Sequence, residues 1–197
     1  VGGWQVGVSH RTHLGAGSLD LDLVHRRGTG AFGALPAPEE AFGEGTSRFA
    51  LWQADARWQW PLHWGAQPVR YSGQWRAQFN RTPLSPQERF AIGGRHTVRG
   101  FNGESSLSAD RGWLLRQELA LPLANSGHAV FFGLDHGQVD GPSADRLVGT
   151  RLTGAVIGLR GAMGAVQYEG FAGWPLHRPD RFRTANTALG FLLSADF

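Results

Sequence analysis

Long stretches of this sequence alternate apolar and polar residues with a period of two. The clearest is QPVRYSGQWRAQFN at 67–80, in which Val69, Tyr71, Trp75 and Phe79 share one face. Because successive side chains of a strand point to opposite faces, this pattern predicts a strand with one apolar and one polar face. Its length exceeds the ~5–6 residues of most soluble strands. It suffices for the ~9–11 residues that cross a bilayer when tilted.

The same pattern recurs along the chain and predicts nine strands in all. The other eight are expected at 2–10, 17–26, 48–60, 112–121, 128–139, 150–161, 163–174 and 184–197. The short connections are expected near 11–16, 61–66, 122–127 and 161–163, and the long ones near 27–47, 80–111, 140–149 and 175–183. Short turns at one end and long loops at the other are typical of outer-membrane β-barrels.

Composition excludes several classes of protein. The chain has no cysteine, so disulfides and thiolate chemistry are excluded. All 19 residues counted as Lys or Arg are arginine, but they are scattered and the net charge is only +3, so no nucleic-acid interface is indicated. No apolar run approaches the ~18 residues of a transmembrane helix, whereas barrel strands are only half apolar. A soluble sandwich or lipocalin-like barrel explains the alternation, but not strands this long with so many outward aromatic residues.

We therefore predict an all-β fold, a transmembrane antiparallel β-barrel. Bacterial single-chain barrels have an even number of strands, and an unpaired edge strand cannot face lipid. Nine strands thus lead us to expect that residues 1–197 are the C-terminal part of one larger barrel domain, with upstream strands absent. The last strand, ending at Phe197, resembles the signal by which the barrel-assembly machinery recognises its clients.

The longest connection carries a distinctive segment within residues 88–123. It contains, in order, Phe90-x-x-Gly93-Gly94, then Val98-Arg99-Gly100-Phe101, then Arg111-Gly112-Trp113. This combination resembles the two-partner-secretion outer-membrane translocators, the TpsB family of haemolysin activators and filamentous haemagglutinin transporters. That family shares a superfamily with the barrel-assembly insertase of the bacterial outer membrane.

The resemblance implies a sixteen-stranded barrel whose sixth extracellular loop folds back into the lumen. There the loop arginine, Arg99, would meet an aspartate on the thirteenth strand, which corresponds to 128–139 here. That segment carries Gly133-Leu-Asp135-His-Gly137, which marks Asp135 and Gly137 as lumenal partners of the loop. The alternation also places Asp135 inward.

Two further details follow from the resemblance. Glu104 and Arg111 are candidates to extend the lumenal network. The wider superfamily tends to place an aromatic residue two positions before the aspartate, where this chain has Gly133. This departure favours a translocator over an insertase.

The implied function is the secretion of one large exoprotein of the haemolysin or adhesin (TpsA) type across the outer membrane of a Gram-negative cell. Its partners would be that exoprotein, the lipid bilayer and the barrel-assembly machinery, with no nucleic acid and no cofactor. Periplasmic polypeptide-transport-associated (POTRA) domains would precede the barrel. An insertase of the same superfamily and a passive porin-like barrel are the alternatives.

An outer-membrane hydrolase is the enzymatic alternative. The eight histidines form no HExxH or other metal-binding spacing, and no GxSxG elbow occurs. Asp135 and His136 are adjacent on a predicted strand, so their side chains point to opposite faces and cannot act together. We therefore expect no catalytic residue and no metal site.

Overall fold

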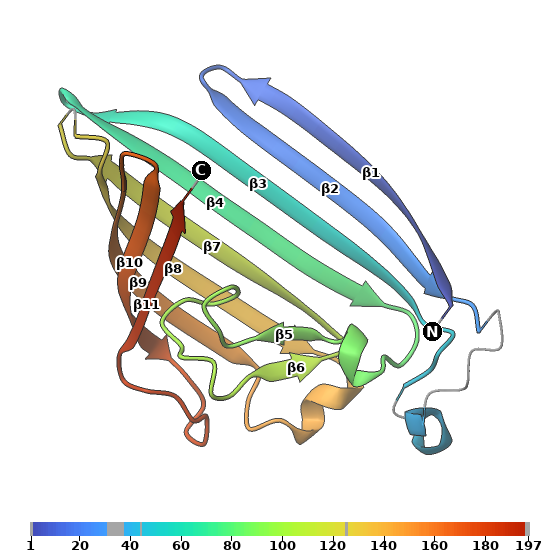
Figure 1. Ribbon diagram of the computed structural model, residues 1–197. Helices are drawn as coiled ribbons and strands as arrows, with labels where there is room; N and C mark the ends of the chain where they lie inside the picture. The colour runs from blue at the N-terminus through green and yellow to red at the C-terminus, as the bar shows by residue number, and fades with distance from the viewer. Residues whose placement is uncertain (1, 31–37, 44, 125, 196–197) are drawn as a thin grey trace.

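The computed structural model describes residues 2–30, 38–43, 45–124 and 126–195. In these ranges nine long strands form one antiparallel sheet in the order β1-β2-β3-β4-β7-β8-β9-β10-β11 (Figure 1). The strands are β1 (Gly3–Leu14), β2 (Gly17–Gly28), β3 (Ala50–Trp64), β4 (Gln67–Asn80), β7 (Arg111–Pro122), β8 (Ala129–Asp140), β9 (Arg151–Met163), β10 (Val166–His177) and β11 (Ala188–Ala195). Within the same ranges, no helix is long and apolar enough to cross a membrane.

Connections of very different length join these strands. Short turns follow β1, β3, β7 and β9 at one end of the sheet, here called the turn end. Gly15, Gly65 and Gly164 begin three of these turns with φ between 61° and 64°, a left-handed conformation that favours glycine and suits two-residue hairpins. The opposite end, the loop end, carries the longer connections. These include the 3₁₀ helices η1 (Pro38–Phe42) and η3 (Pro142–Arg146).

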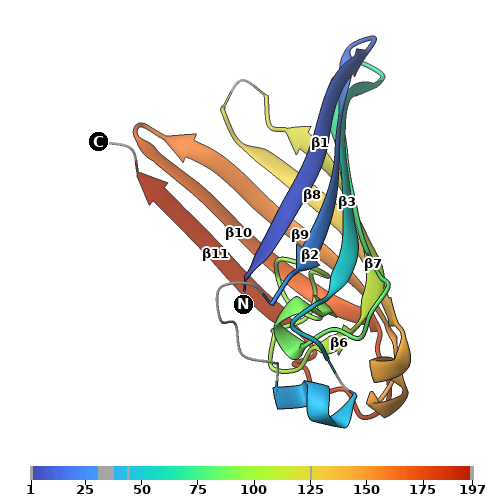
Figure 2. The same cartoon turned by 90° about the vertical axis from the view of Figure 1, so that its right-hand side faces the viewer.

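The sheet is strongly curved, and the connection between β4 and β7 lies on its concave side. Figure 2 shows β1–β4 and β8–β11 on either side of this connection. The connection contains η2 (Pro86–Glu88) and a small hairpin of β5 (Phe90–Ile92) and β6 (Leu107–Ala109). We call residues 81–110 the inner loop. The concave face is the inner face of the sheet, and the convex face is its outer face.

The largest buried cluster of the described residues lies between the inner loop and the sheet wall. Its members are Phe90, Ile92, Val98, Phe101, Leu107, Ala109, Leu114, Val139, Ala144, Leu152 and Phe182. Apolar side chains of the outer face remain exposed instead, as with Leu189 at 81% and Phe191 at 75%. This arrangement suits a sheet whose outer face contacts lipid and whose inner face encloses polar groups.

The predicted number of strands is confirmed, and so is their alternation. Two predicted connections were too long, because β1 runs to Leu14 and β3 to Trp64. In β3 the alternation continues to this end, with Leu62 and Trp64 on the outer face, but Pro61 within the run argues against a strand. In β1 the polar Thr12 on the outer face interrupts the pattern while backbone pairing continues. The short hairpin β5–β6 was not predicted. The predicted assembly signal at Phe197 lies outside the described residues.

Candidate functional site

The tip of the inner loop, residues 98–101, rests on the inner wall of β8, β9 and β10. Val98 is fully buried, Phe101 is 2% exposed and Arg99 is 7% exposed. Gly100 between them adopts φ 101°, a conformation that any other residue would adopt only with strain. A Cβ at Gly100 would also lie 2.5 Å from the carbonyl oxygen of Trp174. Glycine at this position therefore lets the tip press its backbone against β10.

Arg99 binds Asp135 of β8 through three hydrogen bonds. Its Nε donates to Oδ2 at 2.8 Å, its Nη2 donates to Oδ1 at 2.8 Å, and its backbone N–H donates to Oδ2 at 2.9 Å. Asp135 has no solvent exposure. The planar guanidinium matches both carboxylate oxygens at once, a geometry that lysine cannot reproduce. The pair therefore fixes both the position and the orientation of the tip.

A wider ionic network surrounds this pair. Arg99 Nη1 donates to Glu118 of β7 at 2.6 Å, and Glu118 also pairs with Arg160 of β9. Arg160 lies 3.6 Å from Glu169 of β10, measured from Nη1 to Oε2. Arg116 Nε lies 3.7 Å from Asp135 Oδ2. Three arginines thus face three carboxylates, so the cluster is charge-balanced and no member is buried as an isolated ion.

Burial and ion pairing shift the pKa of the Arg99 guanidinium in opposite directions. Burial alone would lower the pKa of its guanidinium. The hydrogen bonds and charges of Asp135 and Glu118 outweigh burial and raise the pKa above its ordinary value. The positive charge of Arg99 is therefore permanent.

Glycines on three strands form a seat for the tip. An added Cβ at Gly133 of β8 would lie 2.5 Å from Arg99 Nη2, and one at Gly154 of β9 would lie 1.9 Å from the Arg99 carbonyl oxygen. A Cβ at Gly173 of β10 would lie 2.8 Å from the Cα of Gly100. Any larger side chain at these positions would push the tip away from the wall.

Further contacts hold the inner loop from its sides. Ile92 and Val98 pack over Gly137, where a Cβ would come within 3.0 Å of both. The Phe101 ring meets Phe182 edge-on at a centroid distance of 5.6 Å, which connects the tip to the segment between β10 and β11. These contacts are apolar and do not involve the ionic network.

Asp110 fixes the C-terminal end of the inner loop. Its carboxylate accepts hydrogen bonds from the backbone N–H of Leu84 at 3.1 Å and of Ser143 at 3.0 Å, and from the Ser143 hydroxyl. Burial alone would raise the pKa of Asp110, but these bonds lower it below its ordinary value. Asp110 therefore joins both ends of the inner loop to η3.

Comparison with known proteins identifies the family. The profile described as haemolysin secretion/activation protein ShlB/FhaC/HecB matches residues 1–161. This chain belongs to that family. Outer membrane transporter CdiB-2 of Burkholderia pseudomallei is 38% identical over 197 residues, with 98% of this chain and 34% of the relative covered. Outer membrane transporter CdiB of Dickeya dadantii is 26% identical over 196 residues, with 98% and 34% covered.

Solved structures agree with this assignment. CdiB from Acinetobacter baumannii superimposes with a TM-score of 0.84 at 33% identity, covering 97% of this chain and 32% of that one. CdiB from Escherichia coli gives 0.81 at 26% identity, covering 98% and 36%. The chain thus spans about a third of the length of these relatives.

Membership of the ShlB/FhaC/HecB family confirms two further predictions. The fold is part of an antiparallel outer-membrane β-barrel, and the two-partner-secretion family is the correct one. The relatives are named outer membrane transporters, which places this chain in the outer membrane as predicted. In such barrels the long loops face outward and the short turns face the periplasm. The loop end is therefore the extracellular end.

The structure brings some of the predicted site residues together and not others. Val98, Arg99, Gly100 and Phe101 all contact the wall, with Asp135 and Gly137 beneath them. The predicted extension through Glu104 and Arg111 is not seen in the described ranges. Arg111 Nε donates to Asp140 Oδ2 at 3.1 Å on the outer face, and Glu104 is exposed. Arg111 is an odd-numbered residue of β7, so it points away from the lumen.

Several residues of the site were missed from the sequence. Arg116, Glu118 and Arg160 form the network that was expected of Glu104 and Arg111. The alternation of β7 and β9 puts these three side chains on the inner face, and that signal was available. The seat glycines Gly154 and Gly173 were missed because a glycine in a strand carries no sign of what approaches it.

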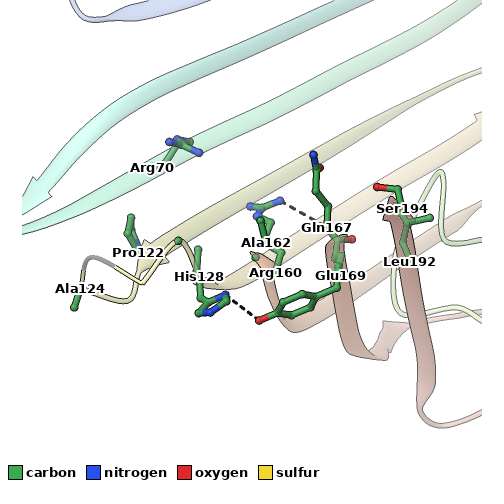
Figure 3. A pocket seen from close by; sticks show the side chains of 14 residues that line it. Arg70, Pro122, Ala124, His128, Arg160, Ala162, Gln167, Glu169, Leu192 and Ser194 are labelled. Carbon is green, nitrogen blue, oxygen red and sulfur yellow. Dashed lines mark hydrogen bonds and ion pairs between the residues drawn. The ribbon is translucent and has the colours of Figure 1, made fainter. Parts of the chain in front are cut away.

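The network ends beside a hollow near the turn end that is lined by both polar and apolar groups. Its volume is about 490 Å³, and its inner-face lining includes Arg70, Arg160, Glu169 and Ser194. Figure 3 shows these side chains around the hollow, together with the ion pair of Arg160. The contacts of Arg99 thus continue through Glu118 and Arg160 toward the periplasmic end of the lumen.

Proposed function

We propose that this chain is the barrel segment of a two-partner-secretion translocator that passes one secreted exoprotein from the periplasm to the cell surface. In this proposal the Arg99–Asp135 pair is a latch that holds the inner loop in the position required for transport. The observation that carries the proposal is the fully buried, three-bond contact between the loop arginine and the wall. Family membership supplies the transport class.

The site supports transport without covalent chemistry. The inner face carries ion-paired groups such as Asp55 with Arg57 and Arg160 with Glu169, so an extended polypeptide meets polar partners there. Folding of the exoprotein outside the cell supplies the direction of movement, because no nucleotide is available in this membrane. The relatives are all named CdiB, which favours the exoprotein partner of a CdiB-type transporter over a haemolysin as the cargo.

Two observations weigh against the other functions. An open porin requires a free lumen, whereas the inner loop occupies the concave side and buries its apolar residues against the wall. An insertase of the wider superfamily is disfavoured because the family profile and the relatives are transporters.

The test uses the full-length parent protein in its native host. Exoprotein in the medium is quantified for the wild type, Arg99→Ala, Asp135→Ala and Arg11→Ala, with the amount of barrel in the outer membrane measured for each. Arg11 is the matched control, because it pairs with Asp20 on the inner face but is 70% exposed. We expect secretion to fall in the first two variants and to persist in Arg11→Ala.

Normal secretion in both Arg99→Ala and Asp135→Ala would show that transport does not require the Arg99–Asp135 latch. A second outcome would overturn the translocator in favour of the insertase. In that outcome no exoprotein depends on the parent protein, and its deletion lowers the amounts of other outer-membrane barrels.

A further inference from the structure

Arginines on the outer face of the sheet all lie near its loop end. Arg27 is the second-last residue of β2, and Arg111 and Arg151 are the first residues of β7 and β9. The remaining strand arginines point to the inner face; they are Arg11, Arg26, Arg57, Arg70, Arg76, Arg116 and Arg160. Outward basic charge is therefore confined to the extracellular end of this barrel segment.

Four neighbouring strands build a compact patch around Arg151. It consists of Trp113 of β7, His136 of β8, Arg151 and Thr153 of β9, and His177 of β10, and we call it the rim patch. The His136 ring lies 5.3 Å from Trp113, between ring centroids, and its Nδ1 lies 2.8 Å from Thr153 Oγ1. Thr153 pairs in register with both His136 and His177.

Positive charge in the rim patch is not neutralised by the protein. Arg151 and His177 are exposed, and within the described ranges Arg151 has no acidic partner. The nearby outward acid, Asp140, is already bound to Arg111. Unpaired guanidinium beside two imidazoles favours an anionic ligand, and guanidinium matches phosphate oxygens in a bidentate manner.

The rim patch lies at the edge of the apolar band. Moving along the strands toward the turn end, the next outward residues are Leu134 on β8 and Ala155 and Ile157 on β9. Trp113 is half-buried at this boundary, a position that amphipathic aromatic rings favour at a membrane surface. Lipid headgroups therefore lie at the same depth as Arg151.

The outer face at the turn end carries aromatic residues but no arginine in the described strands. Trp60 and Trp64 of β3 and Tyr168 of β10 lie on the outer face there, and no outward arginine accompanies them in the described strands. An aromatic girdle alone would serve both membrane surfaces equally. The asymmetry points to an anionic headgroup specific to the outer leaflet, which in this membrane is a phosphorylated glycolipid.

We propose that the rim patch binds a phosphate group of the outer-leaflet glycolipid, with Arg151 as its main ligand and Trp113 against the sugar. This binding surface faces lipid and is separate from the lumenal latch. Its test therefore does not depend on the outcome of the secretion assay.

The experiment measures lipid retention by native mass spectrometry of the full-length protein in detergent. The probes are diphosphorylated lipid A, the same glycolipid without phosphates, and phosphatidylglycerol. The variants are Arg151→Ala, Arg151→Lys and Arg70→Ala; Arg70 is the matched control because it is exposed but faces the lumen.

We expect the wild type to prefer the phosphorylated glycolipid over both other probes. Arg151→Ala should weaken this binding about five-fold, in line with the contribution of one basic residue at an anionic membrane surface. Arg151→Lys should retain only part of the binding, because the ammonium keeps the charge but not the bidentate geometry. Arg70→Ala should retain all of it. Equal retention of phosphorylated and dephosphorylated glycolipid, or unchanged binding in Arg151→Ala, would overturn the proposal. Equal binding of phosphatidylglycerol would overturn the glycolipid assignment.

Discussion

Asp135 and Gly154 are register partners on β8 and β9, and together they accommodate Arg99. Asp135 binds the guanidinium and the backbone N–H of Arg99, whereas Gly154 leaves the space that the Arg99 carbonyl oxygen occupies. Asp135 thus binds Arg99, and Gly154 leaves the space that Arg99 needs. The position of the loop depends on both residues. A substitution at Gly154 can therefore displace the loop while every charged residue is kept.

Gly154→Ala should expel the tip of the inner loop while leaving the ionic residues intact. The added Cβ would lie 1.9 Å from a backbone oxygen, which no side-chain rotation can relieve. We expect faster amide hydrogen exchange across the loop tip, measured by mass spectrometry, because the Arg99 N–H would lose its carboxylate acceptor. Gly170→Ala on β10 is the matched control, since its Cβ would meet nothing within 4 Å. Equal hydrogen exchange in the two variants would contradict the role of Gly154 as part of the seat for the tip.

Arg99→Ala and Asp135→Ala should each destabilise the folded barrel, and the double variant should cost less than the sum. Removing one partner of a buried ion pair leaves the other charge uncompensated, at a typical cost of ~3–5 kcal/mol. Removing both avoids that penalty. Urea unfolding of the full-length protein in lipid would measure the free energies. Additive effects of the two substitutions would show that the Arg99 and Asp135 side chains do not stabilise each other.

Arg99→Lys should restore little of this stability, although it keeps the charge. A lysine ammonium cannot bind both Asp135 oxygens and Glu118 in the fixed geometry of the guanidinium. We expect its unfolding midpoint to lie nearer to that of Arg99→Ala than to that of the wild type. A midpoint equal to the wild type would mean that charge alone holds the tip.

Phe101→Ala should loosen the tip from the segment between β10 and β11. Phe101 is 2% exposed and packs edge-on against Phe182. A buried Phe→Ala change typically costs ~3–5 kcal/mol, and the aromatic pair itself contributes ~0.5–1.5 kcal/mol of coupling. A double-mutant cycle with Phe182→Ala, read by urea unfolding, would isolate the coupling. Exposed Phe42→Ala serves as the control, since that side chain is 82% exposed and should change stability little.

The strands and their faces could be predicted from the sequence because lipid and lumen impose opposite polarity on alternate residues. The side of Asp135 followed from this rule alone, and so did the number of long strands in the sheet. The ends of β1 and β3 were missed for local reasons. Pro61 within the β3 run argued against a strand, although Leu62 and Trp64 keep the alternation, and the outward polar Thr12 interrupts the pattern in β1.

Contacts between distant segments could not be predicted in the same way. Alternation shows that Glu118 and Arg160 face inward, but not that both approach Arg99. Their meeting depends on the curvature of the sheet and on the path of the inner loop across it. Arg111 was misplaced for a related reason: a position beside the motif suggests proximity, whereas strand parity turns the side chain to the outer face.

Asp110→Asn should destabilise the barrel at neutral pH and should lose this effect in acid. The folded pKa of Asp110 is lowered by its hydrogen bonds to Ser143 and Leu84, so the unfolded chain binds a proton more readily than the folded one. Its contribution is therefore fully present above the ordinary carboxyl pKa of 3.8 and is lost as the pH falls through the lower folded value. Urea midpoints of wild type and variant, measured across this range, should converge at low pH. The exposed Asp145→Asn change on η3 is the control and should leave the midpoint nearly unchanged. A difference that stays constant with pH would show that the Asp110 carboxylate anchors the loop through shape and not through charge.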